Sequence, residues 1–200
     1  MNQQEIISLR KKVHQEQYGS IHKPVTYING KRYHFAEQAI PTGNMLIHLP
    51  REFSNMPEYI LKQKYPSENR PQVIKTSSDM CINFAFKLLP IVAKEEDMII
   101  FRNIALNAVK KLCPQHTYLN TGAANYGPKK NQLFCWYDYC GPTLDMEVYS
   151  FNAFMSHNGK PVFFLFNCPK DEYEGWQPIV FEVIDTIRDK PIGWKGEDEK

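Results

Sequence analysis

Residues 135–140, with the sequence CWYDYC, bring two thiols, three aromatic rings and a carboxylate close together. Thiols and carboxylates are metal ligands, and two neighbouring thiols can form a disulfide. In a β-strand, however, residues five positions apart point to opposite faces and lie about 16 Å apart. Cys135 and Cys140 are therefore expected neither to pair nor to share a metal ion.

The same segment alternates in a way that is typical of a strand. Its two faces would consist of Leu133, Cys135, Tyr137 and Tyr139 on one side, and Phe134, Trp136, Asp138 and Cys140 on the other. Because both faces begin with apolar residues, the pattern predicts a central strand that is covered on both sides. A partly exposed aromatic binding surface around Trp136, Tyr137 and Asp138 is the alternative interpretation.

Cys168 is the second candidate for thiol chemistry, because it lies between a predicted strand and a predicted helix, where a helix start lowers a thiol pKa. A nucleophilic thiol also needs a base. A two-residue hairpin at Asn158 and Gly159 would place Cys168 opposite Tyr149, and His157 roughly 27 Å away at ~3.4 Å per residue. Cys168 is therefore predicted to be a core thiol.

No other motif suggests a reaction or a bound group. The five cysteines and six histidines are dispersed without metal-ligand spacing, and the chain lacks the glycine-rich phosphate loops and the nucleophile-elbow motif. We therefore predict no catalytic residue, no metal and no cofactor. An odd number of cysteines without a C-x-x-C pair favours reduced thiols, as in a cytoplasmic protein.

Composition limits the class of protein further. At 200 residues with 42% hydrophobic residues and a net charge of +2, the chain fits one domain with a sizeable core. Its apolar runs are far shorter than a membrane span, and its first residues lack the apolar core of a signal peptide. Because its basic residues are interspersed with acidic ones, nucleic acid is not an expected partner.

The periodicity predicts separate hairpins and helices. Asn29 and Gly30 mark a β-hairpin within residues 25–35, and Pro66 and Pro71 rule out a helix between them. Further strands are predicted at 45–49, 73–76, 79–88, 116–121, 132–140, 147–157 and 160–167, and helices at 56–64 and 95–112. A closing helix carries the stripe Trp176, Ile179, Val180, Val183, Ile184 and Ile187, with Pro178 in its first turn.

This order of elements predicts an α+β fold: a mainly antiparallel β-sheet flanked by helices, as an α/β/α sandwich. Residues 1–39 are predicted to be an N-terminal extension that contains the hairpin, residues 40–190 a single α+β domain, and residues 191–200 a flexible tail.

The chain also resembles the PsbP/DcrB-like superfamily over residues 40–190. The resemblance rests on Leu49–Pro50, on Phe53, and on the segment from Pro66 to Gln72 and Val73. The superfamily includes a Ran-binding nuclear-import factor and chaperones of type VI secretion effectors. The resemblance implies an antiparallel sheet between helices and a non-enzymatic role in binding or assembly.

We therefore predict a cytoplasmic, non-enzymatic module that binds another protein or peptide, with no membrane or nucleic-acid partner. The candidate binding residues are Tyr65, Arg70, Trp136 and Tyr137, because arginine and large aromatic residues dominate interface energetics. A chaperone with one client protein would be a special case. The alternative is a small-molecule binder or hydrolase with a cleft between sheet and helix, using Asp138 and a cysteine. The oligomeric state stays open.

Overall fold

The structure is a computed structural model that describes residues 5, 9, 12–13, 20–42 and 44–194. Most of the predicted extension before residue 20 lies outside the described residues. The same holds for residues 195–200 of the predicted C-terminal tail.

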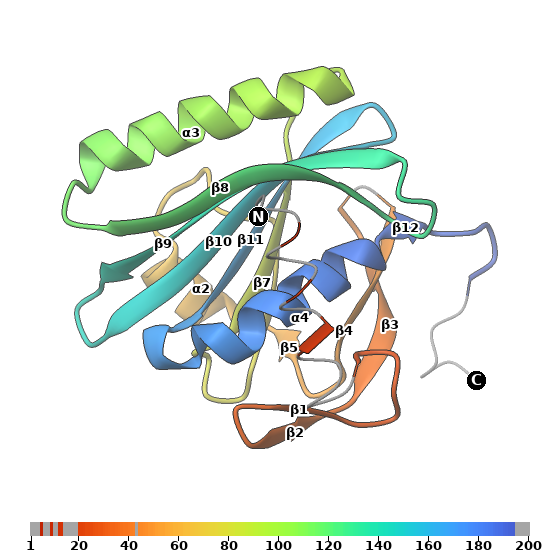
Figure 1. Ribbon diagram of the computed structural model, residues 1–200, viewed down its shortest axis with the longest axis horizontal. Coiled ribbons are helices and arrows are strands. Elements are labelled where there is room, and N and C mark those ends of the chain that lie inside the picture. The colour runs from red at the N-terminus through yellow and green to blue at the C-terminus, as the bar shows by residue number, and fades with distance from the viewer. Residues whose placement is uncertain (1–4, 6–8, 10–11, 14–19, 43, 195–200) are drawn as a thin grey trace.

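A seven-stranded antiparallel sheet forms the centre of the molecule (Figure 1). In spatial order its strands are β5 (Ser54–Asn55), β6 (Val73–Thr76), β7 (Asn83–Leu88), β11 (Lys160–Pro169), β10 (Glu147–His157), β9 (Gln132–Pro142) and β8 (Thr117–Tyr126). Asn158 and Gly159 close the β10–β11 hairpin with φ of 53° and 71°, the left-handed conformation that a tight two-residue turn needs. The predicted register, with Tyr149 opposite Cys168, is confirmed.

Helices cover both faces of this sheet. Helix α3 (Met98–Leu112), preceded by the 3₁₀ turn Glu95–Asp97, and the short helix α2 (Glu58–Lys64) pack on one face. Helix α4 (Tyr173–Asp185) packs on the other (Figure 1). The arrangement confirms the predicted α+β fold with a mainly antiparallel sheet between helices.

Two small sheets complete the α4 side. One is the hairpin of β1 (Thr26–Ile28) and β2 (Lys31–Tyr33), which turns at Asn29 and Gly30 as predicted. The other joins β12 (Arg188–Asp189), β4 (Met45–Pro50) and β3 (Phe35–Ile40). The hairpin contributes Ile28 and Tyr33 to the main core.

The main core lies between α4 and the sheet. The six residues of the predicted helical stripe are all buried: Trp176, Ile179, Val180, Val183, Ile184 and Ile187. The first five lie in α4, as predicted, whereas Ile187 follows the end of the helix at Asp185. The Trp176 ring lies at the centre, 5.1 Å from that of Tyr33 and 5.6 Å from that of Phe166. Two smaller cores occupy the opposite face, one under α3 around Met98 and Phe154, and one under α2 around Met56 and Ile74.

The CWYDYC segment, residues 135–140, lies within strand β9. Strand β9 is central, with Trp136 in the main core and Cys135 and Tyr137 in the core under α3. The prediction that this strand is covered on both faces is confirmed. All five cysteines are unpaired, and Cys168 is buried in the main core as predicted.

Two local predictions were wrong. The strand predicted at 79–88 begins at Asn83, because Asp79 Oδ1 accepts hydrogen bonds from the Ser77 hydroxyl and the Cys81 amide and thereby closes a turn. Pro178 lies in the second turn of α4, since the helix already begins at Tyr173.

No described helix has the length and apolar character that a membrane crossing requires.

Candidate ligand-binding pocket

A row of polar residues crosses the α2/α3 face of the large sheet. Directly paired positions on six neighbouring strands place one polar side chain from each strand in line: Thr76, Asn83, Asn167, Ser150, Tyr139 and Tyr118. Neighbouring residues of this face belong to the apolar cores under α2 and α3. The row therefore interrupts the apolar face where neither helix covers it.

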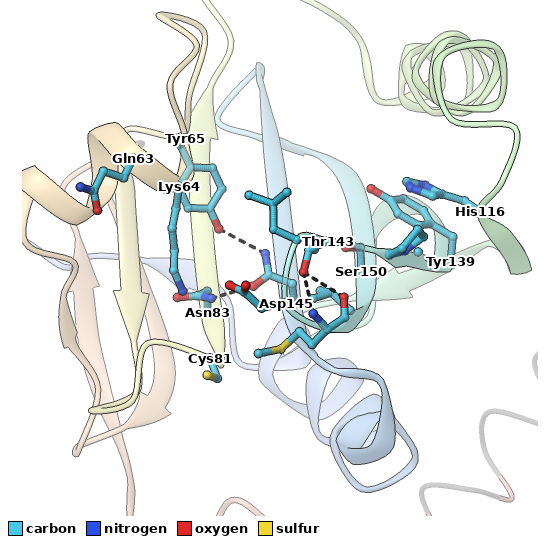
Figure 2. A pocket seen from close by; sticks show the side chains of 16 residues that line it. Gln63, Lys64, Tyr65, Cys81, Asn83, His116, Tyr139, Thr143, Asp145 and Ser150 are labelled. Carbon is cyan, nitrogen blue, oxygen red and sulfur yellow. Dashed lines mark hydrogen bonds between the residues drawn. The ribbon is translucent and has the colours of Figure 1, made fainter.

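A pocket of about 480 Å³ opens above the middle of this row. Asn83, Asn167, Ser150 and Tyr139 form its floor. One wall comes from the end of α2 and the residue that follows it, with Lys64 and Tyr65, and the opposite wall contains His116, as Figure 2 shows. The connection between β9 and β10, from Pro142 to Met146, closes the remaining side. That connection is held by the Thr143 hydroxyl, which donates to the Met146 carbonyl at 2.9 Å.

The floor is joined by a chain of hydrogen bonds. Asn83 Nδ2 donates to Asn167 Oδ1 at 2.7 Å, and Asn167 Nδ2 donates to the Tyr65 hydroxyl oxygen at 3.2 Å (Figure 2). Asn83 is only 3% exposed, and its buried Oδ1 receives no hydrogen bond from the residues that the structure describes. Buried polar atoms usually have a partner. Among the residues that line the pocket, Asn83 Oδ1 on the floor and His116 Nδ1 in the far wall have none within the described residues. Asn83 therefore marks the floor as the place where an outside donor fits.

His116, in the far wall, stacks on Tyr139 at the edge of the floor. Their rings lie 4.7 Å apart with an angle of 15° between their planes. The imidazole also lies directly against the backbone of Gly141, so closely that a Cβ at that position would overlap its ring carbons. A glycine at 141 thus lets His116 reach over β9 and shape the pocket.

The raised pKa values of two tyrosines and one cysteine in the pocket favour binding over nucleophilic chemistry. Burial raises the pKa of Tyr65 and Tyr139, so both phenols stay protonated at neutral pH. Burial, followed by the nearby Asp79 carboxylate, raises the pKa of the Cys81 thiol at the rim. Its Sγ lies 3.4 Å from the Asp79 carbonyl oxygen, which is no base. A catalytic thiol needs the opposite shift.

Asp138 lies on the other face of the sheet, away from the pocket. Its carboxylate accepts hydrogen bonds from the Asn120 amide at 2.6 Å, the Tyr149 hydroxyl at 2.8 Å and Gln177 Nε2 at 2.9 Å. The Asn120 amide can point toward Asp138 because a β-bulge shifts the register of β8 between Tyr118 and Asn120. Asp138 thus ties α4 and three strands together, and the hydrolase hypothesis loses its carboxylate.

The four predicted binding residues lie in different places. Tyr65 lines the pocket. Arg70 is half-buried in the connection between α2 and β6, where its amide donates to the Ser67 carbonyl, and it does not line the pocket. Trp136 and Tyr137 are 1% and 2% exposed. The prediction of a partly exposed surface around them was wrong, because helices cover both faces of β9.

Sequence reasoning missed most of the pocket. Asn83, Asn167 and His116 carried no motif, and the β9–β10 connection was not considered as a wall. The available signal was the hairpin register, which places Ser150 opposite Asn167 on the face of the sheet away from the main core. The pairing of β7 with β11, which brings Asn83 beside them, joins segments more than 70 residues apart and leaves no local signature.

Acidic, histidine and cysteine side chains do not gather into a metal-binding group: within the described ranges, no three of them lie close enough to hold an ion.

Comparison with known proteins finds relatives of the fold alone. No family model matches the chain, and no curated protein matches its sequence. Among solved structures, the cyanobacterial PsbP protein CyanoP from Synechocystis sp. PCC 6803 is 11% identical, with 78% of this chain and 92% of that chain covered and a TM-score of 0.55. LpqN, which is involved in cell envelope biogenesis of Mycobacterium tuberculosis, is 13% identical over 79% of this chain and 92% of that chain, with a TM-score of 0.49.

The likeness to CyanoP establishes a PsbP-like fold, in agreement with the resemblance seen in the sequence. A sequence identity of 11% supports a shared fold, but it does not transfer the role of any functional residue to this chain.

Proposed function

We propose that this PsbP-like chain is a non-enzymatic binding module that holds a segment of another protein in the pocket between α2 and the β9–β10 connection. The observation that carries the proposal is the buried side-chain oxygen of Asn83, which accepts no hydrogen bond within the described part of the chain. Leaving such a group unpaired costs about 1–3 kcal/mol, and a bound partner would recover that free energy. The polar row supplies further donors and acceptors for orientation.

The rim favours a protein over a free small molecule. Leu144 is fully exposed at the tip of the β9–β10 connection, and Met146 beside it is also exposed. Large apolar side chains around a polar floor are typical of surfaces that a partner covers. A volume of about 480 Å³ also falls in the range of small-molecule sites, so a small ligand is the competing outcome of the test.

The proposal includes a cytoplasmic location. Its support is the set of five unpaired thiols, since secreted proteins usually oxidise cysteines to disulfides. A non-catalytic role is supported by the raised thiol pKa of Cys81 and by the position of Asp138 on the opposite face.

Native mass spectrometry on the chain purified gently from its own host tests the proposal. Two variants make the test specific: Leu144→Asp places a charge on the pocket rim, and Ile192→Asp places the same charge at an equally exposed apolar residue near β12. We expect a defined protein mass bound to the native chain and to Ile192→Asp, and at least a tenfold loss of that complex for Leu144→Asp. Retention by both variants would place the partner elsewhere, and a bound mass below that of a peptide would favour the small-molecule alternative.

A further inference from the structure

The hydrogen bonds that connect Asn83, Asn167 and Tyr65 run in one direction. Asn83 Nδ2 lies 3.4 Å from the Met80 carbonyl, which can only accept, and this contact fixes which end of the Asn83 amide carries hydrogen. Asn83 therefore donates to Asn167 Oδ1, and Asn167 in turn presents its Nδ2 to the Tyr65 oxygen. The reverse orientation of either amide would set two oxygens or two N–H groups against each other.

This direction leaves two unused groups, one at each end. At the first end the Asn83 Oδ1 needs a donor. At the other end the Tyr65 oxygen already accepts from Asn167, so its own O–H is free to donate, and nothing in the described part of the chain accepts it. Because burial raises the pKa of Tyr65, that proton is present at neutral pH. The floor thus offers one acceptor and one donor, connected through Asn167.

The charged side chains Lys64 and Asp145 belong to the walls of the pocket and not to its floor. The ammonium of Lys64 lies at the wall and is held by the Met80 carbonyl at 2.6 Å. The floor itself carries only amides and hydroxyls, which are neutral. A carboxylate on the floor would place a negative charge beside the Asn83 oxygen, and an ammonium could donate to that oxygen but would leave the Tyr65 O–H without an acceptor.

We infer that the group seated on this floor is an amide, whose N–H donates to Asn83 Oδ1 and whose carbonyl accepts from the Tyr65 hydroxyl. The inference rests on the proposed function and gives the chemical class that the pocket recognises. The amide can come from a main chain or from a side-chain carboxamide, and the two sources are separated by experiment.

The test is an NMR titration of the ¹⁵N-labelled full chain with three small probes. N-acetylglycine N-methylamide presents main-chain amides, propionamide presents a primary carboxamide, and methyl propionate keeps the carbonyl but lacks the N–H. We expect the side-chain NH₂ signals of Asn83 and Asn167 to shift with the amides, and the ester to bind about tenfold more weakly because one hydrogen bond is lost. Tighter binding of the first probe than of the second would assign the main chain as the source, and the reverse order a side chain.

Tyr65→Phe removes only the hydroxyl that the inference requires, and Tyr59→Phe is its matched control, since Tyr59 is an exposed tyrosine of helix α2, which ends next to Tyr65. Amide affinity should fall about tenfold in Tyr65→Phe and stay unchanged in Tyr59→Phe. Equal binding of ester and amide, an unchanged affinity in Tyr65→Phe, or no shift of the pocket signals with any probe would overturn the inference.

These outcomes are distinct from a failure of the proposed function. If a protein partner is lost in Leu144→Asp while no amide shifts the pocket signals, the proposed function stands and the inference fails. If amides bind while native mass spectrometry finds no protein, the inference stands and the ligand is a small amide.

Discussion

Asn83 on β7 and Asn167 on β11 are joined directly across the sheet, with Asn83 Nδ2 donating to Asn167 Oδ1 at 2.7 Å. The two segments are far apart in the sequence, and their pairing places a neutral polar floor between two apolar cores. This hydrogen bond is the structural basis of the pocket, because it orients both amides and leaves Asn83 Oδ1 available.

The first prediction concerns the stability that this pair contributes. Asn83→Ala should lower the free energy of unfolding by about 1–3 kcal/mol, since Asn167 Oδ1 loses its donor in a partly buried position. Urea unfolding measures the loss. Asn125→Ala, at an exposed asparagine of β8, is the control and should change stability by less than ~0.5 kcal/mol. Equal effects at both positions would show that the cross-strand bond contributes nothing.

The second prediction concerns the contact between Gly141 and His116. Gly141→Ala should push the imidazole off the Tyr139 ring and cost about 1–2 kcal/mol, because the stacked pair is lost and the backbone must adjust. The same substitution in a His116→Ala background should cost much less. A double-mutant cycle measured by urea unfolding gives the coupling, and strictly additive effects would argue against the contact.

The third prediction concerns the pH dependence that Asp138 produces. Burial raises the pKa of this carboxyl, and the hydrogen bonds from Tyr149, Asn120 and Gln177 offset that rise only in part. The folded chain therefore holds the proton at a pH where the unfolded chain, with a pKa near ~3.9, has released it. The stability from this group is fully present below about pH 4 and declines as pH rises through the pKa of the folded state.

Asp138→Asn tests that sign, because the amide cannot ionise. The stability difference between the native chain and the variant should shrink as pH rises from about 4 toward 7, in urea unfolding measured at a series of pH values. Asp145→Asn, at an exposed carboxylate of the β9–β10 connection, serves as the control. A difference that grows with pH would mean that the pKa of Asp138 is lowered in the fold.

The fourth prediction concerns the thiols. Burial raises the pKa of Cys135, Cys140 and Cys168, so these three should react with iodoacetamide at pH 7.5 only after unfolding. Cys81, which is partly exposed, should react earlier but more slowly than a free thiol. Mass spectrometry of digests identifies the labelled residues. Rapid labelling of a buried thiol in the native chain would reopen the question of a catalytic cysteine.

Much of the fold could be predicted from local patterns. The turn at Asn158 and Gly159 defined a hairpin register that the structure confirms along its whole length, and the apolar stripe of α4 was recognised from helical spacing alone. Both features depend on residues close together in the chain, where periodicity and turn chemistry are informative.

The pocket could not be predicted in the same way. Its floor depends on β11 pairing with β7 rather than with a later strand, and its far wall depends on His116 reaching across Gly141. Trp136 and Tyr137 were predicted to bind a partner because they are large aromatic residues. Large aromatic residues also pack well in a core. Helices cover both faces of the sheet and bury these two residues. Of the four predicted binding residues, Tyr65 is the one that lines the pocket, directly after the end of α2.

The most direct test of the central claim is photo-cross-linking inside the host from a benzoylphenylalanine introduced at the rim. Placed at position 144, the probe lies at the mouth of the pocket, and at position 192 it is equally exposed but near β12. The account predicts a covalent adduct with one defined protein from position 144, reduced by Tyr65→Phe and absent from position 192. The same adduct from both positions, or none from position 144, would contradict it.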